Sequence, residues 1–160
     1  MVLFKANLPR TDTKIIIYSL PQLFTGSTWE QLQSYESAWV NLQAVGIANM
    51  YCINSNSQSR LLEYYASKFS TNTHSLPDLD QQILASIKDY YNIEKDLHSL
   101  SKYWQYVLLV DCGTPIKLFS NPIKENMPLR IVKSRKYQYH GVGPDSVVKY
   151  LTSQQEISKI

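Results

Sequence analysis

The sequence predicts an α/β fold in which helices flank a central mixed β-sheet. An apolar run at residues 14–18 leads into helical periodicity, and a second strand-like run follows at residues 50–53. Such a strand, helix, strand unit is almost always a right-handed parallel crossover. Two later runs, residues 106–110 and 116–119, flank a short turn and predict an antiparallel hairpin. The predicted sheet therefore contains both kinds of strand pairing.

The first strand and the helix after it form the centre of the predicted fold. Residues 14–18 are rich in isoleucine, which is typical of a strand buried on both faces. The next segment has apolar residues at steps of three and four, which predicts one core-facing stripe, and it stops at Gly46. The stripe consists of Leu32, Tyr35, Trp39 and Leu42.

The rest of the chain continues the alternation of helices and strands. It contains an amphipathic helix at residues 61–69, a turn at 77–80, a helix at 83–91 and a last helix that opens at Pro144. The last helix places Val147, Val148 and Leu151 on its inner side. The order βαβα, hairpin and terminal helix is that of a thioredoxin-like fold. We predict one domain over residues 1–152, with residues 153–160 as a loose tail.

Composition excludes several classes of protein. The chain has 160 residues, of which 44% are apolar and 18% charged, so a packed core is expected rather than disorder. The net charge of +3 is small, and only Lys133, Arg135 and Lys136 form a basic cluster, so nucleic acid is not an expected partner.

Neither a membrane nor an oxidising compartment is indicated. No apolar run approaches the length of about 20 residues that spans a bilayer, and the N-terminus does not have the pattern of a signal peptide. Two cysteines, Cys52 and Cys112, fall in separate strand regions and give no disulfide framework. We therefore expect free thiols and a cytoplasmic location.

The loop after the first strand carries the most specific motif. Residues 19–29 read Ser-Leu-Pro-Gln-Leu-Phe-Thr-Gly-Ser-Thr-Trp. They resemble the active-site loop of peroxiredoxins, Pro-x-x-x-Thr-x-x-Cys, with Pro21 and Thr25 in place. The position of the family's nucleophilic cysteine holds Thr28.

Further segments resemble the same family in the same order. They are Tyr51–Asn56, Leu76–Asp78, Asp96–Leu97, Trp104–Tyr106 and Val147–Leu151. The likeness covers roughly residues 14–151 and is closest to the branch of the fifth mammalian and the plant type II peroxiredoxins. It implies a redoxin domain of the alkyl hydroperoxide reductase and thiol-specific antioxidant family, and a thioredoxin-like fold.

The resemblance also implies that the peroxidase chemistry is lost. That chemistry needs a thiolate at a helix N-terminus, where N–H groups and the helix dipole lower the thiol pKa. It also needs a cation, and the family's arginine is Gln105 here. Because Thr28 cannot form a comparable nucleophile, we interpret Pro21, Thr25, Thr28 and Gln105 as a vestigial pocket in a pseudoenzyme.

An active enzyme remains the alternative. A peroxiredoxin that uses a relocated cysteine would depend on Cys112 or Cys52, with a thioredoxin- or glutaredoxin-type reductant. Cys52 lies in a predicted buried strand, where cysteine acts as a small apolar residue. Cys112 lies in a turn beside Asp111, whose charge is expected to raise the thiol pKa.

Binding is the favoured role, and two surfaces near the loop could supply it. Relatives commonly pair around this loop, so the resemblance implies a homodimer or protein contact through Leu23, Phe24 and Trp29. Alternatively, the helix N-terminus at Gly26, Ser27 and Thr28 holds a small anion through its N–H groups.

No metal or cofactor site is expected, but a further partner surface is expected. His74, His98 and His140 are far apart and show no ligand spacing, and no phosphate-binding loop or nucleophile motif is present. The chain also carries extra residues at 126–143 relative to the resembled branch. We interpret this insertion as a second place for a partner surface.

Overall fold

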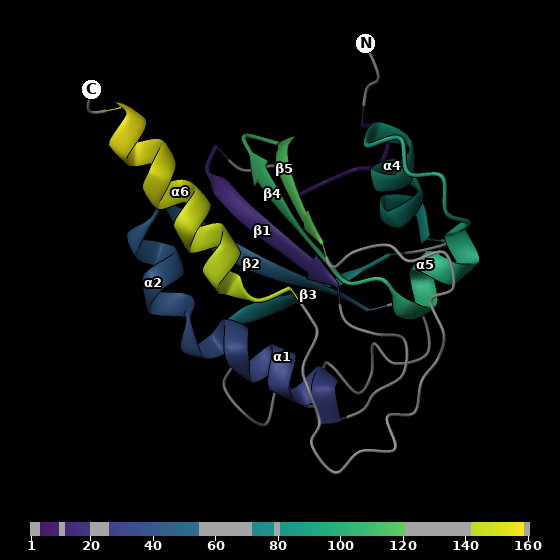
Figure 1. The fold of residues 1–160 in the computed structure, drawn as a ribbon, viewed down its shortest axis with the longest axis horizontal. Coiled ribbons are helices and arrows are strands. Elements are labelled where there is room, and N and C mark those ends of the chain that lie inside the picture. The colour runs from purple at the N-terminus through teal and green to yellow at the C-terminus, as the bar shows by residue number, and fades with distance from the viewer. Residues whose placement is uncertain are drawn as a thin grey trace.

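The structure, a computed structural model, describes residues 4–9, 12–19, 26–54, 72–78, 81–120 and 142–158. Side chains are described for all of these except 26–30, 54, 77, 102, 103 and 158. Within these ranges the chain forms a five-stranded mixed sheet between two helical layers (Figure 1). The predicted fold class is confirmed.

The sheet has the strand order β3-β2-β1-β4-β5. Its strands are β1 (Lys14–Ser19), β2 (Ile47–Asn54), β3 (Thr73–Pro77), β4 (Tyr106–Asp111) and β5 (Thr114–Ser120). The helices are α1 (Gly26–Ser37), α2 (Trp39–Ala44), α4 (Gln82–Tyr90), α5 (Leu97–Tyr103) and α6 (Pro144–Ser158). β1, β2 and β3 run parallel, whereas β4 is antiparallel to both β1 and β5. Both predicted kinds of pairing are present.

Two helical layers bury the two faces of the sheet. Helices α1, α2 and α6 lie on one face, and α4 and α5 lie on the other (Figure 1). Because successive strand residues point to opposite faces, Ile16 and Tyr18 face α1 while Ile15 and Ile17 face α4. These four side chains are fully buried, which confirms the prediction of a central strand.

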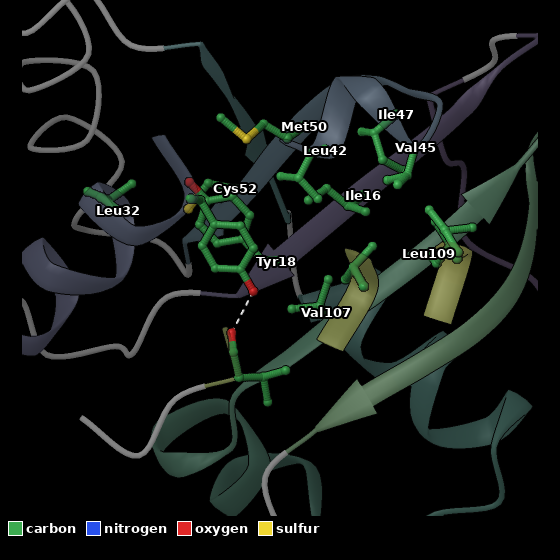
Figure 2. Packing of buried hydrophobic residues seen from close by; sticks show 14 residues of the cluster. Ile16, Tyr18, Leu32, Leu42, Val45, Ile47, Met50, Cys52, Val107 and Leu109 are labelled. Carbon is green, nitrogen blue, oxygen red and sulfur yellow. Dashed lines mark hydrogen bonds between the residues drawn. The ribbon is translucent and has the colours of Figure 1, made fainter. Parts of the chain in front are cut away.

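A pair of stacked tyrosines lies at the centre of the α1 face. The rings of Tyr18 and Tyr35 are 3.9 Å apart and nearly parallel, and both side chains are fully buried. The Tyr18 hydroxyl shares a 2.8 Å hydrogen bond with Thr73, and the Tyr35 hydroxyl donates to the Val142 carbonyl. Figure 2 shows Tyr18 beside Cys52 on this face of the sheet. This pair therefore joins α1, β1, β3 and the segment before α6.

The first helical region differs from its prediction in one respect. The apolar stripe is confirmed, but the helix that carries it is divided at Ala38 into α1 and α2. α2 ends at Ala44, two residues before the predicted stop at Gly46. Gly46 has a φ of +100°, which favours glycine, and its N–H donates to the Gln43 carbonyl.

The edge strand β3 was not predicted, because its five residues are short and partly polar. Glu36 of α1 holds its start in place. One carboxylate oxygen accepts from Asn72 N and Thr73 N at 2.9 and 3.0 Å, and the other accepts from Asn72 N and Nδ2 at 2.9 and 3.0 Å. The strand thus depends on a side chain that is 36 residues away in sequence.

We expect Glu36→Ala to lower the free energy of unfolding by about 1–2 kcal/mol, because it removes hydrogen bonds to a charged acceptor. Urea denaturation measures this loss of stability. Compared with wild type, amide hydrogen exchange in the variant should accelerate most at Thr73. Glu156→Ala, at an exposed position of α6, is the matched control and should change neither quantity. Equal stability of the two variants would contradict this role for Glu36.

Most of the later elements agree with the sequence. α4 matches the predicted helix, with Ile83, Leu84 and Ile87 buried, and β4 and β5 form the predicted hairpin. α5 was not predicted. Its N-cap residue Asp96 accepts a hydrogen bond from Ser99 N at 3.0 Å, and this bond is the largest cause of the lowered pKa of Asp96.

The predicted tail was wrong for most of its length. α6 begins at Pro144 as expected but continues to Ser158, and the side chains of residues 152–157 are exposed. An exposed helical end has no apolar pattern to mark it. The predicted helix at 61–69 and residues 126–141 of the insertion lie outside the described residues. In the described ranges, no helix is long and apolar enough to cross a membrane.

Candidate functional site

The candidate site lies where β1 ends and α1 begins. α1 starts at Gly26, so Ser27, Thr28 and Trp29 belong to its first turn, although their side chains lie outside the description. The loop residues Pro21, Leu23, Phe24 and Thr25 also lie outside it. The helix itself has 12 residues, and no acidic residue lies in its first turn. A group at position 28 is therefore placed at the N-terminus of a helix, as the resemblance requires.

Gln105 lies at the same end of the sheet. It directly precedes β4, is half-buried, and by strand alternation points to the α1 face together with Val107 and Leu109. An amide at this position carries no charge, so it cannot stabilise a thiolate or a developing oxyanion as an arginine does.

Two buried polar side chains, whose roles the sequence did not indicate, connect the elements at this end of the sheet. Gln31 is fully buried and donates from Nε2 to the Ser19 carbonyl at 2.9 Å. The Ser19 hydroxyl accepts from Tyr106 N at 2.9 Å. These bonds join α1 and β4 to the end of β1. The available signal was a polar residue four positions before Tyr35, and therefore on the buried stripe of α1.

Cys52 lies near this end of the sheet but inside the core. It is paired with Tyr18 in the parallel ladder between β1 and β2 and has no exposed surface. Burial raises the pKa of its thiol well above the usual value, and the hydrogen bond with Tyr18 only partly opposes this. The prediction of a small apolar core residue is therefore consistent with its position.

Cys112 lies at the opposite end of the sheet. With Gly113 it forms the two-residue turn between β4 and β5, and both residues have positive φ, 52° and 81°. The neighbouring Asp111 lies opposite Lys14 in the antiparallel ladder, at the start of β1 and five residues before the end of that strand at Ser19. At about 3.3 Å per residue, Cys112 is therefore on the order of 20 Å from the candidate site.

The exposed Cys112 thiol is not activated. Its sulfur donates to Asp111 Oδ1 at 3.4 Å, and this hydrogen bond, followed by weak desolvation and the Asp111 charge, raises the pKa of Cys112. The predicted direction of this shift is confirmed. A raised pKa reduces the thiolate fraction at neutral pH, so the sulfur is accessible but a poor nucleophile.

We expect Asp111→Asn to speed alkylation of Cys112 by iodoacetamide severalfold at pH 8. The wild-type rate should rise with pH and reach half its maximum above the usual pKa of a thiol, whereas the variant should do so at lower pH. Mass spectrometry should find Cys52 unmodified in the folded protein, and Cys112→Ser serves as the control without label. Equal rates in wild type and variant would contradict the role of Asp111.

The other predicted uses of this region remain predictions. Dimer contact through Leu23, Phe24 and Trp29 depends on side chains that are not described, as does an anion held by Ser27 and Thr28. In the part of the chain with described side chains, no three His, Cys, Asp or Glu residues come together as possible metal ligands.

Comparison with known proteins connects this arrangement to a fold. No family model and no curated protein sequence matches the chain. Solved structures do match. Reduced Prx3 from Vibrio vulnificus has a TM-score of 0.63 and 13% identity, and the match covers 95% of this chain and 96% of that one.

Two further structures from other organisms match in the same way. The Plasmodium falciparum antioxidant protein, a 1-Cys peroxiredoxin, has a TM-score of 0.59 and 19% identity over 89% of this chain and 80% of that one. The reduced Plasmodium vivax 2-Cys peroxiredoxin has a TM-score of 0.60 and 15% identity over 92% and 68%. The chain therefore has the thioredoxin-like fold seen in peroxiredoxins.

Proposed function

We propose that this chain is a peroxiredoxin-like protein that has lost thiol peroxidase activity and acts by binding. One observation carries the proposal: the chain has two cysteines, and the surroundings of both raise the thiol pKa. Cys52 has no exposed surface, and Cys112 lies at the end of the sheet away from α1. Neither supplies the activated thiolate that attack on a peroxide bond needs.

The residues at the family's reactive positions support the same proposal. Thr28 presents an alcohol, whose proton is held far too tightly to leave near neutral pH without a paired base. Gln105 offers an amide, which donates hydrogen bonds without charge. Together the two changes remove the sulfur nucleophile and the positive charge that supports it. Reverting one of them would therefore restore the peroxidase chemistry only in part.

A peroxidase that uses Cys112 is the second candidate, because this thiol is exposed. Steady-state peroxide consumption with dithiothreitol or with a thioredoxin system distinguishes the two. We expect no turnover above that of free cysteine, and no change in Cys112→Ser or Cys52→Ser. Turnover that is clearly faster and is lost in one of these variants would overturn the proposal.

For the binding role, we propose self-association through the surface formed by Leu23, Phe24 and Trp29. Support comes from the resemblance, since relatives pair around this loop, and from the three large apolar side chains in seven residues. We expect light scattering to give a dimer mass at micromolar concentration and a monomer mass for Phe24→Asp. Val40→Asp, which changes an exposed valine on α2, is the control and should remain dimeric. A wild-type monomer would contradict this mode of binding.

A further inference from the structure

Helix α5 lies on the face of the sheet away from α1, and its packing there is incomplete. Among its described side chains Leu100 alone is buried, whereas α4 on the same face buries four. A pocket of about 30 Å³, partly open to solvent, lies between α5, α4 and the strand ends, and Leu100, Ser101 and Trp104 form its α5 side. Because local stability depends on buried apolar contact, α5 is held less firmly than α4.

Two buried donors lie where α5 meets β4. They are the indole N–H of Trp104 and the hydroxyl of Tyr106, whose side chains are 3% and 2% exposed and whose rings are 5.1 Å apart. In the described structure neither donor has a hydrogen-bond partner, and both polar atoms are shut off from solvent. Each gives up the hydrogen bonds that it makes to water in an open or unfolded chain, so each raises the free energy of the packed arrangement. Such groups are uncommon in folded proteins and require an explanation.

Movement of α5 away from the sheet would hydrate both donors. Trp104 is the C-cap residue of α5, and its N–H donates to the Leu100 carbonyl at 3.1 Å, so its ring moves with the helix. That ring lies against Tyr106, which the movement would therefore uncover. The opposing cost is the exposure of Leu100 and the indole ring, a small part of the core. We propose that α5 is a lid that opens locally while the sheet stays folded, and that Trp104 and Tyr106 donate to water in the open state.

Native-state hydrogen exchange at low urea concentration tests this proposal. Two backbone amides report the opening, because Leu100 N donates to the Asp96 carbonyl and Trp104 N to the Leu100 carbonyl, both at 3.1 Å. We expect both to exchange faster than the amides of β4, at rates that hardly change with urea, since local opening exposes little surface. The indole N–H of Trp104, one of three tryptophans, should exchange through the same opening, and its resonance is assigned by its loss in Trp104→Phe.

Tyr106→Phe tests the cause of the opening, because it removes one unpaired donor and keeps the ring. The closed state gains from this change, so we expect α5 to open less often by about fivefold or more. Tyr18→Phe is the matched control. It removes a buried hydroxyl that is hydrogen-bonded to Thr73 on the opposite face, and it should not make the opening rarer.

Three results would each overturn the proposal. The first is exchange of the α5 amides only together with those of β4, which would show that α5 does not open alone. The second is equal opening of α5 in Tyr106→Phe and wild type. The third is an equal slowing of exchange in Tyr18→Phe, because the effect would then not depend on an unpaired donor.

Discussion

Replacing Thr28 by cysteine is expected to raise the rate of reaction with hydrogen peroxide by at least about tenfold at pH 7. Position 28 lies in the first turn of α1, where N–H groups and the helix dipole stabilise a thiolate. Thiols at helix N-termini have pKa values of about 3.5–7.5, against about 8.5 for free cysteine, so the thiolate fraction rises by roughly this factor. The measurement is best made in a Cys112→Ser background, which removes the exposed native thiol.

Gln105→Arg should raise the rate further in this background and do nothing on its own. An arginine at this end of the sheet is expected to stabilise a thiolate at position 28, whereas Thr28 offers no thiolate to stabilise. Thr28→Ser is the control for altered packing and should react no faster than wild type. If Thr28→Cys reacted like free cysteine, position 28 would not be a former nucleophile position, and the account of the site would fail.

Tyr35→Ala is expected to lower the free energy of unfolding by about 3–5 kcal/mol, the largest stability effect that we predict. The substitution removes a fully buried ring that stacks on Tyr18 at 3.9 Å. It also leaves the Val142 carbonyl without the hydroxyl that donates to it. Because this pair joins α1 to the segment before α6, both should loosen together.

Tyr35→Phe separates the ring from the hydroxyl. It keeps the stacked ring and loses the hydrogen bond to Val142, so a cost of about 1–2 kcal/mol is expected. Chemical denaturation measures both variants, and amide exchange reports whether α6 is released. A cost below about 1 kcal/mol for Tyr35→Ala would show that the stacked pair does not organise this face.

Much of the fold could be predicted because its strongest signals are local. β1 and β4 are continuous apolar runs, which are typical of strands buried on both faces, and the buried stripe of α4 follows the helical period. β3 could not be predicted in this way, since a short edge strand with His74 and Ser75 exposed has little apolar pattern. Its position depends on pairing with β2 and on Glu36, both distant in sequence.

The candidate site could be predicted only in part. A motif fixes position 28 at the start of a helix, and neighbouring residues predict the effect of Asp111 on Cys112. Contacts between segments that are distant in sequence produce no comparable sequence pattern. The hydrogen bond from Gln31 to Ser19 depends on how α1 packs against β1. A polar residue on a buried stripe was its one sequence signal.

The second-order rate constant for reaction of the reduced wild-type protein with hydrogen peroxide tests the central claim most directly. Competition with a haem peroxidase measures it without a reductant, so a missing partner cannot hide activity. The loss of an activated thiolate predicts a rate no greater than that of free cysteine. A rate orders of magnitude higher would show that Cys52 or Cys112 carries the chemistry, and the proposed loss of peroxidase activity would be wrong.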